Sequence, residues 1–455
     1  MNAPIRSSEG AVAAARTQGR FSRYVHGAHA DGRLVVQPRM GFADLATMRE
    51  GLLGVRGADA TATGTITLDS YTRVNDHDSA RQALRTGAEL NGFPLVAHGP
   101  DATRQLLDSV SGPVSASGGR DFPVQVRHGS ALPYPLFEAM VAAGVDATEG
   151  GPVSYCLPYS RAPISAAVKA WAQCCELIAA QPDPMHLESF GGCMLGQLCP
   201  PSLLVALSVL EGLFFREHGL SDISLSYAQQ THPGQDLEAI AALRRLAGER
   251  LAEADWHVVL YTFMGVFPRT PVGSFRILEE SVRLAVRSGS ERLIVKTPAE
   301  AHRIPTIAEN VDALEFAASI ARDEAGRGAE VAPTESGVYE EARLLVDSTL
   351  ELAPTVGEAL IRAFERGHLD VPYCLHQDNA NKSRAYVDPA GMLQWAEAGR
   401  MPLRVERGAS RRPVSAKGLL TMLGFNEQRF DREQLTNGHL RGLQYPGRTA
   451  RRGLS

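Results

Sequence analysis

The sequence lacks the features that mark secreted, membrane-spanning and nucleic-acid-binding proteins. It has only six cysteines and no C-x-x-C spacing, so neither a disulfide framework nor a zinc ribbon is expected. Residues 1–30 contain no apolar core of signal-peptide length, and no apolar run reaches the roughly 20 residues that cross a bilayer. The formal net charge of −5 offers no basic surface for nucleic acid. We therefore expect a cytoplasmic protein with no membrane segment and no nucleic-acid partner.

Apolar strand patterns alternate with helix patterns from about residue 32, which is typical of a parallel α/β architecture. Strands are predicted over 33–39, 64–72, 90–98, 122–128, 146–150, 186–191, 222–228, 256–264 and 291–296. Helices are predicted over 43–56, 101–110, 133–143, 164–180, 201–217, 236–253 and 272–287. In the last of these, Phe275, Leu278 and Val282 lie on one face, which suits a helix that covers a barrel wall.

This alternation predicts a TIM-type (β/α)8 barrel with a C-terminal extension. An open doubly wound sheet is disfavoured, because no G-x-G-x-x-G follows the first strand and polar residues follow many strands instead of one switch point. The strand candidates outnumber the barrel positions by one, so either 90–98 or 291–296 is expected to be something else. We expect a flexible N-terminal segment over 1–31, the barrel over 32–328, and a helical and irregular extension over 329–455.

Three arginines lie near the ends of apolar runs: Arg39 in 34–39, Arg73 in 66–73 and Arg127 in 122–129. The carboxyl ends of barrel strands share the face that carries active sites, so these guanidinium groups are expected to converge. Arginine binds a carboxylate through two parallel hydrogen bonds and keeps its charge, and three such groups suit a substrate with two carboxylates. Taken singly, an arginine at a strand end is usually part of a surface ion pair, but three at equivalent positions favour a shared site.

Glu149 follows another predicted strand, beside Gly150 and Gly151, and precedes Tyr155 and Tyr159. Because glycine allows close approach, this carboxylate could accept a substrate ammonium and its proton. The alternative is a turn whose glutamate faces water.

Two further motifs allow two interpretations each. His128 could be an acid or base, but no second ligand stands at metal spacing, so a hydrogen-bonded core histidine and no metal site are expected. Thr297, Pro298 and Glu300 match a capped helix start. Lys296, in contrast, points from a strand end toward the arginines, where it could bind cofactor hydroxyls with Glu300 or form a Schiff base.

These segments resemble a known family, the large catalytic subunit of adenosylcobalamin-dependent glutamate mutase, also called methylaspartate mutase. The resemblance covers about 32–325 and rests on the order and spacing of Q-P-R at 37–39, D-S-Y-T-R at 69–73, L-N-G-F-P at 90–94, R-H-G at 127–129, E-G-G at 149–151 and V-K-T-P at 295–298. Pro152 and the segments 190–196 and 227–236 differ from the family's usual form.

The resemblance implies roles for particular residues. Arg39, Arg73 and Arg127 would grip the two substrate carboxylates, Glu149 would act as the base, and Tyr155 and Tyr159 would contact substrate. The residues that would face the cofactor are Gly41, Asn91, Lys296 and Glu300. The implied reaction is a radical interconversion of L-glutamate and L-threo-3-methylaspartate, in which glutamate fragments into a glycyl radical and acrylate that recombine.

The resemblance also implies partners. Adenosylcobalamin would be held with a separate small subunit that carries D-x-H-x-x-G, in a heterotetramer built on a homodimer of the large subunit. The run 255–260 of this chain begins D-x-H but ends in leucine and has the pattern of a buried strand, so the cobalt ligand is expected on the other chain. Two alternatives stay open: a Schiff-base lyase that uses Lys296, and a non-catalytic barrel that binds a dicarboxylate or scaffolds a partner.

Overall fold

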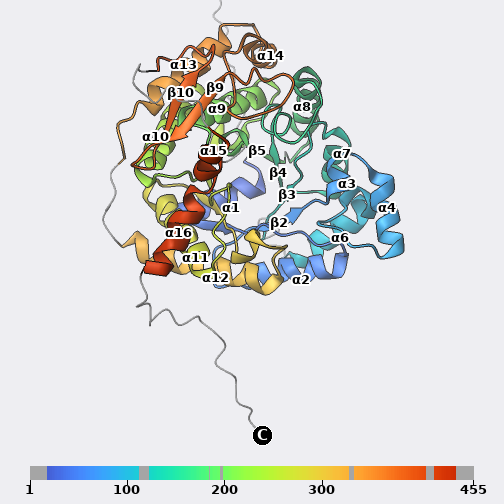
Figure 1. The fold of residues 1–455 in the computed structure, drawn as a ribbon. Helices are drawn as coiled ribbons and strands as arrows, with labels where there is room; N and C mark the ends of the chain where they lie inside the picture. The colour runs from blue at the N-terminus through green and yellow to red at the C-terminus, as the bar shows by residue number, and fades with distance from the viewer. Residues whose placement is uncertain are drawn as a thin grey trace, which may run out of the picture.

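The computed structural model describes residues 18–111, 122–183, 185–194, 198–326, 333–405 and 415–436. At its centre, eight parallel strands lie in the order β1-β8-β7-β6-β5-β4-β3-β2 and are surrounded by helices (Figure 1). The strands are β1 (Val35–Gln37), β2 (Gly64–Thr67), β3 (Val124–Arg127), β4 (Ala147–Gly150), β5 (His186–Ser189), β6 (Asp222–Ala228), β7 (Asp255–Tyr261) and β8 (Arg292–Ile294). The prediction of a TIM-type (β/α)8 barrel is confirmed.

The barrel closes where β1 meets the start of β2. No ladder joins these two described strands; a parallel bridge between Val36 and Ala62 and a hydrogen bond from Thr67 N to Met40 O (2.8 Å) connect them. The surplus strand candidate is 90–98, because Phe93 forms only an isolated bridge with Leu68 before a short helix begins. The candidate 291–296 contains β8.

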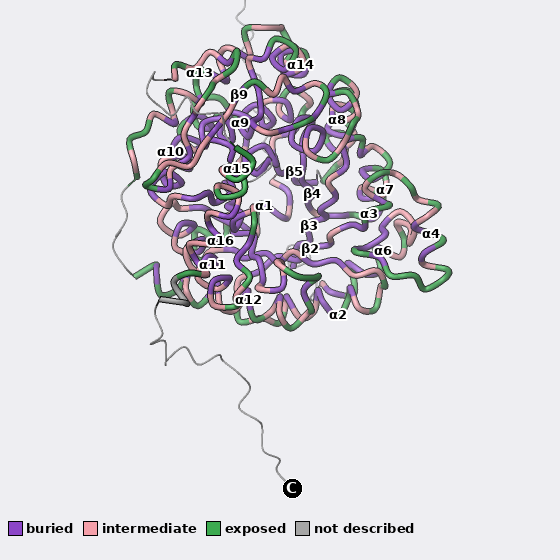
Figure 2. Tube along the Cα trace, in the orientation of Figure 1, coloured by how far each residue is buried: buried purple, intermediate pink, exposed green. Residues whose placement is uncertain are grey.

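Helices cover the outside of the barrel, and their buried faces pack on strands whose residues are mostly buried (Figure 2). The main ones are α2 (Leu45–Arg56), α6 (Pro100–Val110), α7 (Tyr134–Ala143), α8 (Ile164–Ala179), α9 (Pro201–Glu217), α10 (Pro233–Arg250), α11 (Pro271–Arg287) and α12 (Ile307–Ala325). Three unpredicted short helices, α3 (Ser70–Arg73), α4 (His77–Thr86) and α5 (Leu95–His98), separate β2 from β3. None of the helices in the described ranges is long and apolar enough to cross a membrane.

A polar network fills the amino-terminal end of the barrel. Arg292 is fully buried, forms an ion pair with Glu188, and donates to Gln37 Oε1 at 2.6 Å. Beside it, the rings of His186 and His257 stack with their centroids 5.0 Å apart. Buried polar groups are tolerated when they are hydrogen-bonded to one another, as most of these are.

The prediction of a flexible segment over 1–31 is wrong for its last part. Residues Arg20–Ala30 form helix α1, which packs across this end of the barrel, while residues 1–17 lie outside the described ranges. Phe21 is fully buried against the His186 ring, and Ser22 donates to Asp222. The Ala-rich and Ser-rich composition suggested flexibility, but the two large apolar residues Phe21 and Val25 provide a buried face.

The extension begins with α13 (Val338–Leu350) and α14 (Val356–Arg366), which pack near α8, α9 and α10. A hairpin of β9 (Ser383–Val387) and β10 (Leu393–Ala398) follows, although an irregular segment was predicted there. Helices α15 (Ala416–Leu423) and α16 (Phe425–Thr436) then return to the barrel, where α16 packs on α11 (Figure 1).

Candidate active site

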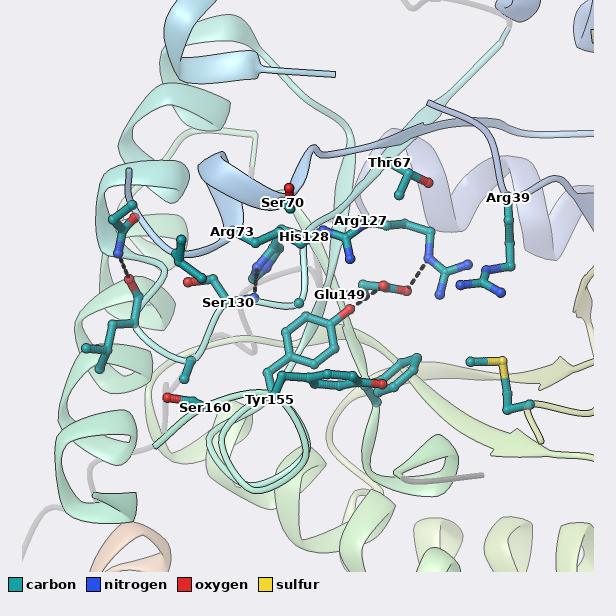
Figure 3. A pocket seen from close by; sticks show the side chains of 18 residues that line it. Arg39, Thr67, Ser70, Arg73, Arg127, His128, Ser130, Glu149, Tyr155 and Ser160 are labelled. Carbon is teal, nitrogen blue, oxygen red and sulfur yellow. Dashed lines mark hydrogen bonds and ion pairs between the residues drawn. The ribbon is translucent and has the colours of Figure 1, made fainter. Parts of the chain in front are cut away.

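A cavity of about 450 Å³ opens at the carboxyl ends of the barrel strands (Figure 3). Its walls include all three strand-end arginines, a buried carboxylate and two tyrosines: Arg39, Arg73, Arg127, Glu149, Tyr155 and Tyr159. The structure therefore brings together the six residues for which the sequence predicts substrate binding and catalysis.

The three arginines reach the cavity from different elements. Arg127 is the last residue of β3 and Arg39 lies two residues beyond β1. Arg73 was expected at the end of a strand, but β2 stops at Thr67 and Arg73 ends helix α3 instead. The chain turns because Asp69 caps this helix: its Oδ1 accepts hydrogen bonds from Tyr71 N (2.9 Å) and Thr72 N (3.1 Å).

Substituting Asp69 with alanine is expected to lower stability by about 1–2 kcal/mol, the usual cost of losing a helix cap. The catalytic efficiency, kcat/KM, should also fall by roughly tenfold or more, since Arg73 would lose its fixed position. Asp44→Ala is the matched control, because Asp44 caps α2 in the same way (Thr47 N, 2.8 Å) but does not line the cavity. Equal loss of kcat/KM in both variants would show that the α3 cap does not position Arg73.

Two of the arginines have donors to spare. Arg73 donates from Nε to Leu68 O at 2.9 Å, and no described carboxylate forms an ion pair with its guanidinium. Arg127 forms an ion pair from Nε to Glu149 Oε2 at 2.8 Å, while its buried Nη1 has no hydrogen-bond partner among the described residues. An unpaired buried donor is costly, so Nη1 of Arg127 is open to an acceptor supplied by a bound molecule.

Glu149, the third residue of β4, is almost fully buried and accepts hydrogen bonds on both oxygens. Tyr155 donates to Oε1, and Tyr261 donates to Oε2 at 2.7 Å. Burial alone would raise the pKa of Glu149, but the charge of Arg127 and these hydrogen bonds outweigh burial and leave the pKa lowered. The side chain is thus a carboxylate at neutral pH, and the alternative of a water-facing glutamate is wrong.

The two tyrosines differ in exposure. Tyr155 is buried, and burial together with the nearby Glu149 carboxylate raises the pKa of its hydroxyl well above the usual value, so it stays a donor. Tyr159 is 53% exposed and its ring meets that of Tyr155 edge-on at 5.9 Å. Tyr159 therefore lies at the opening of the cavity and Tyr155 in its wall.

His128 lies in the wall as a neutral core histidine. Burial lowers its pKa to about 3, and its Nδ1 accepts a hydrogen bond from Ser130 N at 3.0 Å. Its ring stacks on Trp171, with the centroids 5.8 Å apart. No group of three His, Cys, Asp or Glu side chains within the described ranges could hold a metal ion.

The four residues assigned to a cofactor lie next to the cavity. Glu300 accepts from Arg39 Nη1 at 3.1 Å, so it does not serve as the capping-box residue, although Thr297 does cap the turn η2 (Pro298–Ala301). Lys296 is buried, with its Nζ 5.1 Å from the centre of the Phe267 ring. Burial lowers the pKa of Lys296 to about 8, although Glu300 opposes this shift.

Asn91 and Gly41 shape the adjoining backbone. Asn91 Oδ1 accepts from Ser70 N at 2.9 Å, and Ser70 lines the cavity. A Cβ atom at position 41 would overlap the carbonyl oxygen of Thr67, so only glycine fits there.

The sequence analysis missed Tyr261 and Glu188. Tyr261 ends β7 and contacts Glu149, while Glu188, in β5, contacts Tyr261 and Arg292. Both lie in strands that are buried on both faces, where no alternation separates residues that point into the barrel from residues that point outward.

A (β/α)8 barrel that gathers arginines and an ionised carboxylate at the carboxyl ends of its strands has the active-site arrangement of an enzyme. The chain matches the family model described as methylaspartate mutase E chain over residues 16–415, and it belongs to this family of isomerases. Relatives named glutamate mutase epsilon subunit support this assignment. The protein of Yersinia enterocolitica is 30% identical over 402 residues, which span 84% of this chain and 81% of that protein. The protein of Halobacterium salinarum is 30% identical over 371 residues, or 78% of this chain and 74% of that protein.

Proposed function

We propose that the chain is the catalytic subunit of an adenosylcobalamin-dependent mutase that interconverts L-glutamate and L-threo-3-methylaspartate by a radical mechanism. The observation that carries the proposal is the charge pattern of one cavity: three guanidinium groups and one ionised carboxylate. An amino acid with two carboxylates and one ammonium presents the complementary charges.

Each charge of such a substrate has a partner. Arg73 and the unpaired Nη1 of Arg127 suit one or both carboxylates, and Arg39 adds a third guanidinium beside Arg127 (Figure 3). Glu149 Oε1 accepts one hydrogen bond from Tyr155 and retains a lone pair for the ammonium. Fixing both ends of the substrate would keep its fragments in place while the carbon skeleton changes.

Glu149 is proposed to hold the substrate ammonium and to accept its proton. A carboxylate at this position is anionic before substrate arrives, which attracts the ammonium. Arg127 and the two tyrosine hydroxyls hold it in a fixed orientation for proton transfer.

The residues beside the cavity fit the sugar of an adenosyl group. Lys296 is a buried donor that makes no hydrogen bond with the described residues, and the Glu300 carboxylate, whose charge acts on it, is an acceptor for hydroxyl groups. Asn91 and Gly41 lie on the neighbouring loops. When bound, adenosylcobalamin supplies the carbon radical that starts the reaction. The barrel walls would exclude water from it.

The proposal includes a separate small subunit that carries the D-x-H-x-x-G motif, bound to a homodimer of this chain. His257 of the incomplete motif is fully buried at the amino-terminal end of the barrel, beside Arg292 and His186. It is therefore on the wrong side of the barrel to ligate a cobalt ion at the mouth. A cytoplasmic location also belongs to the proposal, and all six cysteines are free thiols.

The isolated chain is expected to show no glutamate turnover and only weak adenosylcobalamin binding. Adding a small subunit with a complete motif should restore turnover, measured as 3-methylaspartate formation. Tight stoichiometric cobalamin binding by this chain alone would contradict the proposal that a separate small subunit holds the cobalamin. If the chain binds a dicarboxylate but shows no turnover with any small subunit and cobalamin, the alternative of a non-catalytic dicarboxylate-binding barrel would be favoured.

One observation favours a second candidate, a Schiff-base lyase. Burial lowers the pKa of Lys296 to about 8, so a fraction of its amine is neutral at neutral pH. Borohydride would trap substrate on Lys296 in a lyase and would leave the lysine unmodified in a mutase.

A further inference from the structure

The Tyr261 hydroxyl lies between two buried carboxylates. It is 2.7 Å from Glu149 Oε2 and is also in hydrogen-bond contact with Glu188 Oε1. All three side chains are buried, and they come from three adjacent or nearby strands, β4, β5 and β7. Glu188 does not line the cavity, and the proposed mechanism assigns it no role.

One hydroxyl proton cannot serve two acceptors fully. Burial and the neighbouring carboxylates raise the pKa of Tyr261 well above its usual value, so the phenol keeps its single proton. Each carboxylate is instead paired with an arginine, Glu149 with Arg127 and Glu188 with Arg292. At any moment the proton therefore points mainly to Glu149 or mainly to Glu188.

The second oxygen of Glu188 is already occupied. Oε2 accepts from Gln125 Nε2 at 3.1 Å and from the guanidinium of Arg292. Arg292 is held in turn by Gln37. Glu188 is thus fixed, with Oε1 directed at Tyr261.

We propose that Glu188 is a positioning residue that sets the proton affinity of Glu149 through the Tyr261 hydroxyl. With the phenol proton on the Glu188 side, Glu149 has one donor fewer and is the stronger base. With the proton on its own side, Glu149 is stabilised as an anion and returns its proton. The inference rests on the proposed function, in which Glu149 takes a proton from the ammonium nitrogen and gives it back to the same atom; the phenol proton only turns and is not transferred.

The substitutions proposed for the test leave the other side chains that face Glu149 and Glu188 unaltered. Those facing Glu149 and Glu188 are Arg127, Tyr155, His128, Arg73, Tyr159, Cys193, Arg292 and Gln125.

Substitutions of Glu188 and of Tyr261 should shift the proton affinity of Glu149 in opposite directions. In Glu188→Gln, Arg292 and Gln125 require the amide oxygen on their side, so the amide NH₂ donates to Tyr261 and the phenol proton goes wholly to Glu149. The proton affinity of Glu149 should fall. In Tyr261→Phe, Glu149 loses that donor and its proton affinity should rise. Each change should be on the order of one pH unit in the protonation midpoint.

The protonation midpoint of Glu149 is measured by infrared titration of the isolated chain. The Glu149 band is identified by comparing each variant with the same variant that also carries Glu149→Gln. No substrate, cofactor or partner is needed, so failure of the proposed function leaves this test intact. Tyr227→Phe is the matched control, because it removes a buried phenol bonded to Asp236 (2.8 Å) and should leave the Glu149 band in place.

In the double variant Glu188→Gln/Tyr261→Phe, Glu188→Gln should shift the Glu149 midpoint less than it does in the presence of Tyr261, because no phenol hydroxyl remains to reorient. In the assembled enzyme, Glu188→Gln should lower kcat by about tenfold with little change in KM, because Glu149 keeps its charge. Shifts in the same direction, or no shift in either single variant, would overturn the proposal. If Glu188→Gln does not fold, Tyr261→Phe alone decides: an unchanged Glu149 midpoint would refute it.

Discussion

Replacing Glu149 with glutamine is expected to reduce turnover by roughly 10²-fold or more, the usual scale for a lost acid–base group. Glutamine keeps the shape of the side chain but has no charge to attract the ammonium and no basic oxygen to take its proton. The measurement is steady-state formation of 3-methylaspartate by the variant assembled with its small subunit. Binding of the cofactor and of that subunit should be unchanged.

The substitution also leaves the buried Arg127 without its ion pair, so stability must be controlled. Glu324→Gln provides the comparison: Glu324 is a buried carboxylate paired with Arg283 and Arg287, among helices on the outside of the barrel. It should lower the melting temperature and leave turnover normal. If Glu149→Gln turns over normally while the assembly with the small subunit falls apart, Glu149 is structural and the mechanism is wrong at its centre.

Lysine at position 73 or 127 is expected to lower kcat/KM by about tenfold or more, although the positive charge is retained. An ammonium cannot form the two parallel hydrogen bonds with which a guanidinium orients a carboxylate. Arg73→Lys is the cleaner variant, because Arg73 has no ion pair with a described residue, whereas Arg127→Lys also changes the contact with Glu149. Isothermal titration with glutamate measures the binding part of the loss.

Arg81→Lys serves as the control, since Arg81 forms an exposed ion pair with Asp78 on α4 and should tolerate lysine without effect. Unchanged kinetics in a folded Arg73→Lys protein would remove that residue from the site.

The alternation of strand and helix patterns along the sequence predicts most of the fold, because few architectures are compatible with it. Arginines near the ends of separate apolar runs also pointed to one cavity without any structure. The helix α3 that carries Arg73 was not predictable in the same way. In the sequence, the buried cap residue Asp69 looks like any polar residue in an apolar run. The helix α1 was missed because its buried face depends on only two large side chains, Phe21 and Val25.

Glu188 and Tyr261 show a different limit. Tyr261 contacts Glu149 and Glu188, which lie 112 and 73 positions away in the sequence, and these strands show no alternation of exposed and buried residues. Only the register of β4, β5 and β7 places their side chains on one level of the barrel. Local sequence signals do not determine that register.

Helix α1 has a consequence for how ligands exchange. With Phe21 packed on His186 at the amino-terminal end of the barrel, the cavity has its opening on the opposite face. Under the proposed function, substrate and product would both pass through this opening, and a partner bound over it would retain a ligand in the cavity. Order of addition should therefore matter: a non-reactive dicarboxylate supplied before the partner would leave slowly, and one supplied afterwards would enter slowly.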